Sequence, residues 1–426
     1  MTDPLSLGVA LIIFLGTMLA GFPIYAGILA AALYLNVFIN HVTLEAVFAG
    51  LYESLTKPSL LAVPLFILTG SFMEASTMGE RLINVFVRFL RRVRAGLPLA
   101  CLFSNALFGA ISGSAPAAAA TFAKIAYQPL REEYGDDLAT GLITSSGALS
   151  TIIPPSIIMI IYGVVTDTSI SSLFLGGFVP GLILVSIVGT YLVFRCRKRE
   201  MPVAAAEPKG KRLSWWGAVP VLLIPLIVLG GIYGGFFTPT EAGAVAAVYC
   251  ALVAVLGYRD IGLRAVMGIF GEGARTTGKV FILIATSAVL AQAATLAQVP
   301  QMLTETFSGL SPWMFLLMLN VVLLIAGALM DPSSAILILT PLLLPTARRL
   351  GIDPMQVGIV LTVNLSIGMF TPPFGLNIFV VQSILKKPLE EIAVAVYPYV
   401  ILYVIGLLLI TYLPGVSLWL PRLMAS

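Results

Sequence analysis

Apolar stretches long enough to cross a lipid bilayer recur from one end of the chain to the other. A membrane-spanning helix needs about 20 mostly apolar residues. Such stretches occupy residues 4–20, 22–38, 59–77, 137–163, 171–195, 216–235, 239–257, 279–298, 355–383 and 389–413. Only 10% of the 426 residues are charged, whereas a soluble domain carries about 25%. So few charges could not cover a soluble surface, so the sequence predicts an all-α polytopic membrane protein. It excludes a cytosolic enzyme, a nucleic-acid-binding protein and a secreted disulfide scaffold.

Two further apolar blocks, 97–129 and 312–347, are each interrupted halfway by residues that break helices. The breakers are Ser112-Gly113-Ser114 in the first block and Asp331-Pro332-Ser333-Ser334 in the second. Each arm has about 15 residues, or roughly 22 Å of helix at 1.5 Å per residue. That is shorter than a hydrocarbon core of about 30 Å. We therefore expect two re-entrant helical hairpins, each entering and leaving the membrane on the same side.

The basic residues predict how the chain is oriented. The stretch from Arg195 to Arg212 holds seven of them and is assigned to the cytoplasm, because cytoplasmic loops carry an excess of Lys and Arg. Of the 24 Lys and Arg, 19 then lie inside, four lie outside, and Lys124 lies within a hairpin. The four outside are Lys57, Arg348, Arg349 and Arg422. This split predicts an N-terminus outside the cytoplasm, which the family resemblance described below would make periplasmic. If either hairpin crossed the membrane completely, the loops after it would change sides and the charge asymmetry would be smaller.

The sequence also repeats itself. FPIYAGILAAALY (22–34) aligns with TPTEAGAVAAVYC (238–250), FGAISGSAPA (108–117) aligns with AGALMDPSSA (326–335), and Pro154-Pro155 aligns with Pro372-Pro373. In the predicted topology the two copies face opposite ways, which is the inverted repeat typical of secondary transporters. The first copy is 1–195, with hairpin 97–129 and broken helix 137–163. The second is 216–426, with hairpin 312–347 and broken helix 355–383, and a basic cytoplasmic linker, 196–215, joins them.

Paired prolines interrupt the two predicted broken helices, at SGALSTIIPPS (146–156) and NLSIGMFTPPFGLN (364–377). Prolines remove backbone donors and disfavour helix just before them, so carbonyls upstream lose their partners. In a membrane such carbonyls are tolerated only if they are buried or line a wet cavity. Freed carbonyls with Ser and Thr hydroxyls suit a hard cation such as Na⁺, and half-helix N-termini suit an anion. The alternative, that the prolines only kink helices, does not explain their matching positions in both copies.

Several polar residues in apolar segments admit both a structural and a functional interpretation. Asp331 fits a helix N-cap before a proline, but a carboxylate deep in a membrane costs about 2.5–3.5 kcal/mol, which favours a role as a ligand. Asn364 is either a helix–helix hydrogen-bonding group or a substrate contact. We expect Glu241 to be a structural cap and Lys124 to reach the membrane interface. A lone histidine, His41, and three scattered cysteines predict no zinc or haem site.

Three segments carry a family resemblance: GGFFTPTEAGAVAAVYC, STIIPPSIIMIIYG and GIDPMQVGIVLTVNLSIGMFTPPFGLN. They resemble the large membrane subunit of tripartite ATP-independent periplasmic (TRAP) transporters, and the resemblance extends over nearly the whole chain. It implies a bacterial or archaeal inner-membrane protein of the ion-transporter superfamily, in which a mobile transport domain moves like an elevator against a scaffold. It also implies Na⁺-driven uptake of an organic anion such as a C4-dicarboxylate or a sialic acid. The implied partners are a small membrane subunit and a periplasmic substrate-binding protein, with no cofactor besides the coupling Na⁺.

The same resemblance implies two sodium sites. The residues for the first are Ser112, Gly113, Ser114, Ser150, Thr151 and Ile153. The residues for the second are Asp331, Ser333, Ser334, Gly368 and Thr371. We expect the substrate between the tips and the breaks, at Ser114, Pro154, Pro155, Ser156, Asn364, Pro372 and Pro373.

Three other functions stay open on the sequence. A stand-alone Na⁺/anion symporter of the same superfamily would need no binding protein. An intramembrane enzyme would need an acid/base or metal cluster facing a cavity, and the sequence offers one histidine and no acidic pair. A passive channel would show no saturable exchange of substrate.

Overall fold

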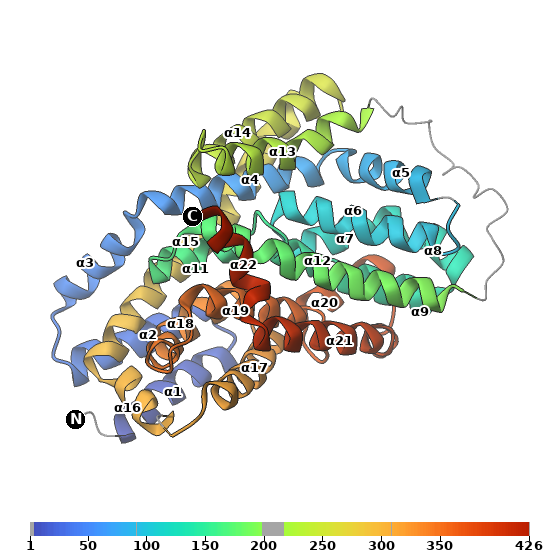
Figure 1. Ribbon diagram of the computed structural model, residues 1–426. Helices are drawn as coiled ribbons and strands as arrows, with labels where there is room; N and C mark the ends of the chain where they lie inside the picture. The colour runs from blue at the N-terminus through green and yellow to red at the C-terminus, as the bar shows by residue number, and fades with distance from the viewer. Residues whose placement is uncertain (1–3, 91, 198–216, 308, 426) are drawn as a thin grey trace.

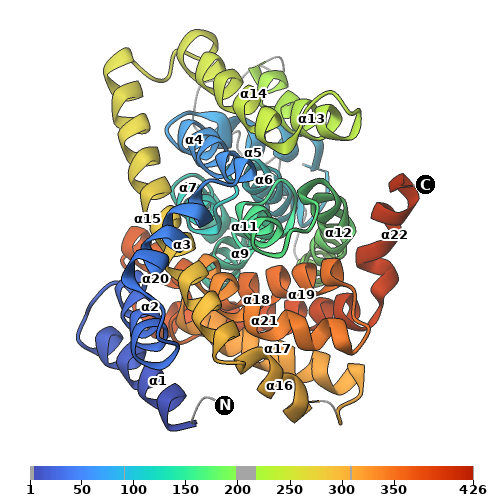
Figure 2. The same cartoon turned by 90° about the vertical axis from the view of Figure 1, so that its left-hand side faces the viewer.

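The computed structural model describes residues 4–90, 92–197, 217–307 and 309–425, and every secondary-structure element within these ranges is a helix. By length and apolar character, six of the described helices could cross a membrane, or seven if one bent pair counts as a single span. This confirms the predicted all-α polytopic class. Most of the predicted linker 196–215 lies outside the described residues. Figures 1 and 2 show the arrangement of the helices.

The chain opens with apolar helices that pack on each other and then a bent pair. These elements are α1 (Pro4–Leu19), α2 (Ile24–Leu33) with the π-helical turn η1 (Tyr34–Ile39), α3 (Leu44–Leu55), the 3-10 turn η2 (Pro58–Leu61), α4 (Ala62–Glu74) and the amphipathic α5 (Met78–Leu90). The bend of 58° between α3 and α4 falls at Thr56 and Lys57. Pro58 explains it, because proline disfavours helix at the residue before it. The sequence predicted α4 but not α3.

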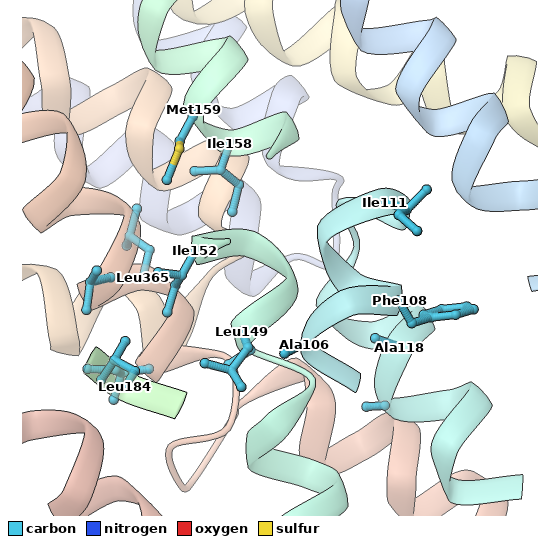
Figure 3. Close-up of a cluster of buried hydrophobic side chains, with 14 of the residues drawn as sticks. Ala106, Phe108, Ile111, Ala118, Leu149, Ile152, Ile158, Met159, Leu184 and Leu365 are labelled. Atoms are coloured by element: carbon cyan, nitrogen blue, oxygen red, sulfur yellow. The ribbon is translucent and has the colours of Figure 1, made fainter. Parts of the chain in front are cut away.

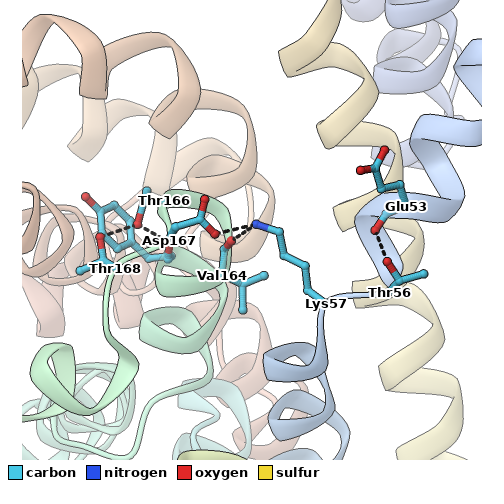
Figure 4. Close-up of polar contacts among 8 residues, drawn as sticks. Glu53, Thr56, Lys57, Val164, Thr166, Asp167 and Thr168 are labelled. Atoms are coloured by element: carbon cyan, nitrogen blue, oxygen red, sulfur yellow. Dashed lines mark hydrogen bonds and ion pairs between the residues drawn. The ribbon is translucent and has the colours of Figure 1, made fainter.

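Lys57, at this bend, contacts a helix far along the chain (Figure 4). Its Nζ donates to the carbonyl oxygen of Val164 and to the carboxylate of Asp167, each at 2.8 Å. Val164 lies in the last turn of α11 (Ile157–Thr166), and Asp167 ends that helix in the left-handed conformation. A cation stabilises the exposed carbonyls of a helix C-terminus. Lys57 therefore ties the bent pair α3–α4 to the end of α11.

The middle of the chain forms the layer that carries the first proline pair. Its helices are α6 (Gly96–Ser112), α7 (Ala115–Ile125), α8 (Tyr127–Tyr134), α9 (Asp136–Ser146), α10 (Leu149–Ile152), α11 and α12 (Ile170–Arg195). The predicted hairpin 97–129 corresponds to α6 and α7, and the predicted broken helix 137–163 corresponds to α9, α10 and α11. Both predicted interruptions are therefore present as breaks between helices.

The second half of the chain begins with α13 (Val219–Tyr233) and α14 (Pro239–Leu252), with the π-helical turn η4 (Val253–Gly257), which lie on the far side of the first layer beside α4 and α5 (Figure 2). The long α15 (Leu263–Leu296) runs along one side of the molecule towards an adjacent layer that carries the second proline pair. The helices after it are α16 (Val299–Phe307), α17 (Pro312–Leu329), α18 (Pro332–Arg349), α19 (Pro354–Gly368), α20 (Leu376–Leu385), α21 (Leu389–Tyr412) and α22 (Pro414–Ala425). The predicted hairpin 312–347 corresponds to α17 and α18, and the broken helix 355–383 corresponds to α19 and α20.

Two expectations about lengths were wrong. The predicted span 279–298 is not a separate element, because α15 continues without a break from Leu263. Helices α17 and α18 have 18 residues each, rather than about 15, because only Met330 and Asp331 separate them. At about 27 Å, α17 alone is long and apolar enough to cross a membrane. Length therefore supports a re-entrant path for α6 and α7 but does not decide it for α17 and α18.

The same local backbone recurs 218 residues along the chain. In η1 the N–H of Asn40 donates to the Leu35 carbonyl at 2.8 Å, and in η4 the N–H of Tyr258 donates to the Val253 carbonyl at 2.7 Å. His41 and Arg259, the next residue in each case, both adopt the left-handed conformation, with φ of 54° and 58°. A π-helical turn is rare, so its recurrence at the spacing of the sequence repeat is hard to explain without duplication.

After each proline break, the chain continues into a helix that packs on the other half of the chain. Helix α11 follows the first break but packs on α18 of the second hairpin pair, and α20 follows the second break but packs on α7 of the first. Within each layer, α6 packs on α10 and α17 packs on α19. The residues at the two breaks are thus held by helices from both halves of the chain.

A second cross-link joins the halves near the ends of these helices. Lys387, between α20 and α21, pairs with the carboxylate of Asp136 at the start of α9 and donates to the Thr140 hydroxyl at 3.0 Å. The Tyr127 hydroxyl donates to the same carboxylate at 2.6 Å. Burial alone lowers the pKa of the Lys387 ammonium, but the hydrogen bonds with Asp136 and Tyr127 outweigh it and raise the pKa above its ordinary value.

We expect the substitution Lys387→Met to lower the free energy of unfolding by about 1–2 kcal/mol at pH 8, since it removes charge-assisted hydrogen bonds from a largely buried ammonium. A folded-state pKa above the unfolded value of about 10.4 stabilises the fold below that pH, and the contribution disappears as the pH rises through the folded pKa. Denaturation at pH 8 and pH 11 measures both effects. The exposed neighbour Lys386→Met is the control, and an unchanged deficit at pH 11 would contradict the assignment.

Candidate ion and substrate site

The first hairpin tip is a tight turn between α6 and α7. Helix α6 ends at Ser112, Gly113 turns the chain with a φ of 64°, and Ser114 caps α7 by accepting from the N–H of Ala117 at 3.4 Å. A Cβ at Gly113 would lie 3.0 Å from the side chain of Ile157, at the start of α11. The tip therefore lies directly against the helix that follows the first proline pair.

The second tip is built around Asp331, which caps α18. One carboxylate oxygen accepts from the N–H of Ser334 at 3.0 Å, and the other accepts from the Ser334 hydroxyl at 2.5 Å. Pro332 takes the first helical position, as predicted for an N-cap. The structural interpretation of Asp331 is confirmed, and its role as an ion ligand stays a prediction. Ser334 is buried and Ser333 is partly exposed.

At the first break the prolines leave carbonyls without helical donors, as expected. Residues 154 and 155 would supply the N–H groups for Ser150 and Thr151, and both are prolines. The hydroxyl of Ser156 donates to the Thr151 carbonyl at 2.6 Å in their place. Because that hydroxyl is engaged there, it does not cap α11, and the first turn of α11 receives no side-chain cap. The peptide bond between Pro154 and Pro155 is cis.

The second break follows the same scheme with a different substitute donor. In a continuous helix the carbonyls of Gly368 and Met369 would accept from the N–H groups of residues 372 and 373, which are prolines. The N–H of Asn377, at the start of α20, donates to the Met369 carbonyl at 2.8 Å, and the N–H of Thr371 donates to that of Gly368 at 3.1 Å. The Pro372–Pro373 bond is also cis.

Each hairpin is fixed to its break by a close backbone approach. A Cβ at Gly109 of α6 would lie 2.5 Å from the Cα of Ser150, and a Cβ at Gly368 would lie 2.5 Å from the Cα of Gly327 in α17. Side chains cannot fit at these points, so the glycines allow the helices to touch. The spacings from Gly109 to Gly327 and from Ser150 to Gly368 both equal the 218-residue repeat. The structure thus brings each predicted tip beside its predicted break.

The two breaks also touch each other. The hydroxyl oxygens of Thr151 and Ser366 lie 2.6 Å apart, and the Asn377 amide nitrogen donates to the Thr144 carbonyl of α9 at 3.1 Å. The sequence analysis missed Ser366 and Asn377 as site residues. Both lie within the quoted motif NLSIGMFTPPFGLN, and a search for polar residues beside the prolines would have found them.

Buried asparagines surround the breaks. Asn364 donates to Asn320 of α17 at 2.8 Å, and Asn105 of α6 donates to Ser146 at 2.7 Å, so both make the helix–helix hydrogen bonds expected of them. The side-chain carbonyl oxygens of Asn105, Asn364 and Asn377 are nevertheless buried without a hydrogen-bond partner among the described residues. Such oxygens require water or an ion to be satisfied.

Apolar side chains pack beside the first break. Figure 3 shows Leu149 and Ile152 of α10 among side chains from α6, α11, α12 and α19. Asp331 is the only predicted site residue with an ionisable side chain. Lys124 is exposed on α7, and the predicted cap Glu241 is confirmed, since its carboxylate accepts from the N–H of Thr238 at 2.8 Å in a capping box. The site therefore offers neutral oxygens rather than charges.

Comparison with known proteins now decides the family. The family model described as "Tripartite ATP-independent periplasmic transporter, DctM component" matches residues 11–416. The chain belongs to this family of TRAP transporter large permease subunits. The permease is 41% identical to the C4-dicarboxylate TRAP transporter large permease protein DctM of Pseudomonas aeruginosa, over 87% of this chain and 88% of the relative.

Other relatives carry different substrate names. The permease is 36% identical to DctM of Rhodobacter capsulatus, covering 97% of this chain and 99% of the relative. It is 33% identical to the sialic acid TRAP transporter large permease protein SiaM of Vibrio cholerae, covering 96% and 97%. These relatives are transporter permeases and not enzymes, so the intramembrane enzyme is excluded.

Solved structures share the fold at low sequence identity. The YdaH transporter of Alcanivorax borkumensis superposes with a TM-score of 0.60 at 14% identity, covering 87% of the permease and 88% of that chain. MtrF of Neisseria gonorrhoeae gives 0.59 at 12% identity, covering 86% and 83%. The permease therefore has the fold of known membrane transporters.

We expect Gly368→Ala to lower the free energy of unfolding of the permease by about 1–3 kcal/mol, because its methyl group would overlap the backbone of Gly327. Gly268→Ala in α15 is the matched control, since a Cβ there meets nothing within 4 Å. The control should be neutral or stabilised by up to about 1 kcal/mol, because alanine favours helix. Thermal unfolding in detergent compares the two, and equal effects would refute the close approach.

Proposed function

We propose that this permease is the large membrane subunit of a Na⁺-coupled transporter that takes up an organic anion, a carboxylate such as a C4-dicarboxylate or a sialic acid. The family supplies the transporter class, and two relatives are named for C4-dicarboxylates and sialic acid. The observation that carries the coupling is the pair of hairpin tips fixed beside proline-freed carbonyls. Apart from the Asp331 carboxylate, the oxygens of the proposed sites are neutral hydroxyl and carbonyl groups, and such oxygens suit a hard monovalent cation.

The two sodium sites of this proposal lie one at each tip. The first is formed by Ser112, Gly113, Ser114, Ser150, Thr151 and Ile153. The second is formed by Asp331, Ser333, Ser334, Gly368 and Thr371. Support comes from Gly109 against Ser150 and Gly327 against Gly368, which bring a tip and a break together in each half.

For the substrate, the proposal uses the space between the tips and the proline pairs. Its residues are Ser114, Pro154, Pro155, Ser156, Asn364, Pro372 and Pro373. The first turn of α11 supports an anion there, because its N–H groups carry no side-chain cap and lie beside Gly113. Asn364 is packed against Asn320 under the second break, so it would act mainly by holding α19 in place.

An inverted repeat and an elevator-like motion complete the proposal. The recurrence of η1 in η4 supports duplication. The contact of Lys57 with Val164 and Asp167 would join the scaffold to the moving domain in this conformation. We place the permease in the inner membrane with its N-terminus in the periplasm, working with a small membrane subunit and a periplasmic binding protein that delivers the substrate.

Uptake into liposomes tests the coupling. We expect the permease with its small subunit to accumulate a labelled carboxylate only when an inward Na⁺ gradient and the substrate-loaded binding protein are both present. Equal uptake with a K⁺ or proton gradient in place of Na⁺ would overturn the proposal.

The binding-protein requirement separates two further alternatives. Na⁺-dependent uptake without the binding protein would instead favour a stand-alone symporter. A channel would be indicated by uptake that does not saturate and shows no counterflow exchange.

A further inference from the structure

The point of contact between the two breaks is a pair of buried hydroxyl groups. Thr151 is 2% exposed and Ser366 is 0% exposed, and their oxygens lie 2.6 Å apart. Thr151 belongs to α10 at the first break, and Ser366 lies in the last turn of α19, two residues before Gly368 at the second. This pair therefore links Thr151, which is proposed for the first sodium site, to the turn of α19 that carries Gly368 of the second.

The pair has more hydrogen-bond contacts than protons to fill them. Besides their mutual contact, the Thr151 hydroxyl lies 2.9 Å from the carbonyl oxygen of Ala148, and the Ser366 hydroxyl lies 2.6 Å from that of Thr362. These three contacts require three donated protons, because neither carbonyl can donate. Two hydroxyls carry only two protons. One of the three contacts is therefore unfilled at any moment.

Only two arrangements keep the mutual hydrogen bond. In the Thr151-donor arrangement, Thr151 donates to Ser366, Ser366 donates to Thr362, and the Ala148 carbonyl loses its hydroxyl donor. In the Ser366-donor arrangement, Ser366 donates to Thr151, Thr151 donates to Ala148, and the Thr362 carbonyl loses its donor. A rotation of both hydroxyl protons converts one into the other without moving a heavy atom.

A cation beside either hydroxyl favours one arrangement over the other. Positive charge near an oxygen attracts its lone pairs and opposes a second proton pointing at it. A cation at the first break therefore favours the Thr151-donor arrangement, in which Thr151 accepts no proton. A cation at the second break favours the Ser366-donor arrangement for the same reason. The two ions thus prefer opposite arrangements of the same pair.

We propose that the Thr151–Ser366 hydroxyl pair is a positioning element that makes the two sodium sites unequal, so that the first Na⁺ to bind weakens the second. This inference rests on the proposed function, since it assigns a coupling between its two ion sites. The coupling is reciprocal, as linkage requires. Its consequence is an ordered pair of affinities, with one ion held tightly and the other bound and released readily.

The test is the Na⁺ dependence of thermal stability in the full-length permease. Each bound ion stabilises the folded state, so the slope of the unfolding temperature against the logarithm of Na⁺ concentration increases when a second ion binds. Choline chloride replaces NaCl to keep ionic strength constant. We expect Ser366→Ala to lower the Na⁺ concentration at which the slope increases by about 5-fold or more, the lower end of common allosteric couplings.

Matched variants separate the effect of the Thr151–Ser366 hydroxyl pair from a general loss of packing. Thr151 is itself a proposed ligand of the first site, so Thr151→Val should weaken that site. In that background Ser366→Ala should cause no further shift, because the mutual hydrogen bond is already lost. Ser366→Thr keeps the hydroxyl and should behave like the wild type. Thr144→Val removes a buried hydroxyl whose one partner among the described residues is the Thr140 carbonyl of its own helix, at 2.7 Å. This variant should leave unchanged the Na⁺ concentration at which the slope increases.

The outcomes distinguish failure of the proposed coupling through the hydroxyl pair from failure of the proposed function on which it rests. If Ser366→Ala folds and the Na⁺ concentration at which the slope increases is unchanged or higher, the proposed coupling through the hydroxyl pair is wrong. Na⁺-coupled transport is not contradicted by that result. If Ser366→Ala does not fold, Ser366→Cys, whose thiol is only a weak hydrogen-bond donor and acceptor, decides the question by the same criterion. If the wild type gains no stability from Na⁺ over choline, the proposed function fails, and the proposed coupling through the hydroxyl pair fails with it.

Discussion

A main-chain carbonyl that has lost its helical N–H partner cannot face hydrocarbon, and this constraint organises the centre of the permease. Two proline pairs create such carbonyls at matching positions, and at each break a nearby group donates a hydrogen bond to one of them. At the first break the donor is the Ser156 hydroxyl, and at the second it is the Asn377 N–H. Each hairpin also packs closely on its own break, with Gly109 against Ser150 and Gly327 against Gly368.

The helices that follow the proline breaks join the two halves of the chain. Helix α11 leaves the first break to pack on α18, and α20 leaves the second break to pack on α7. The second arm of each hairpin therefore packs on the helix that follows the other half's break, and the Thr151–Ser366 and Asn377–Thr144 hydrogen bonds join the two breaks. The helices that pack around the two breaks therefore come from both halves of the chain.

Features set by short-range chemistry were predictable from the sequence. Gly113 turning the first tip, Asp331 capping α18 and the breaks at the proline pairs all depend on neighbours along the chain. The features that the sequence did not predict depend instead on contacts between distant parts of the chain. The continuity of α15 depends on its packing against α2, α3, α4 and α18, and the contact of Ser366 with Thr151 joins residues 215 positions apart. No pattern within a single helix specifies such partners, although the repeat did indicate that the two breaks are equivalent.

The distribution of charge limits how a site of this kind can hold an anion. None of the proposed site residues is basic, and the one acidic residue, Asp331, neutralises the N-terminus of its own helix, α18. The N-terminus of α11 carries no such side-chain cap, so it offers the stronger positive potential of the two. A helix end supplies only about half a charge, too little to hold a carboxylate away from water. On the proposed function, bound Na⁺ would supply the remainder. Sodium would then be part of the anion site itself, which gives a physical reason for transport to depend on both.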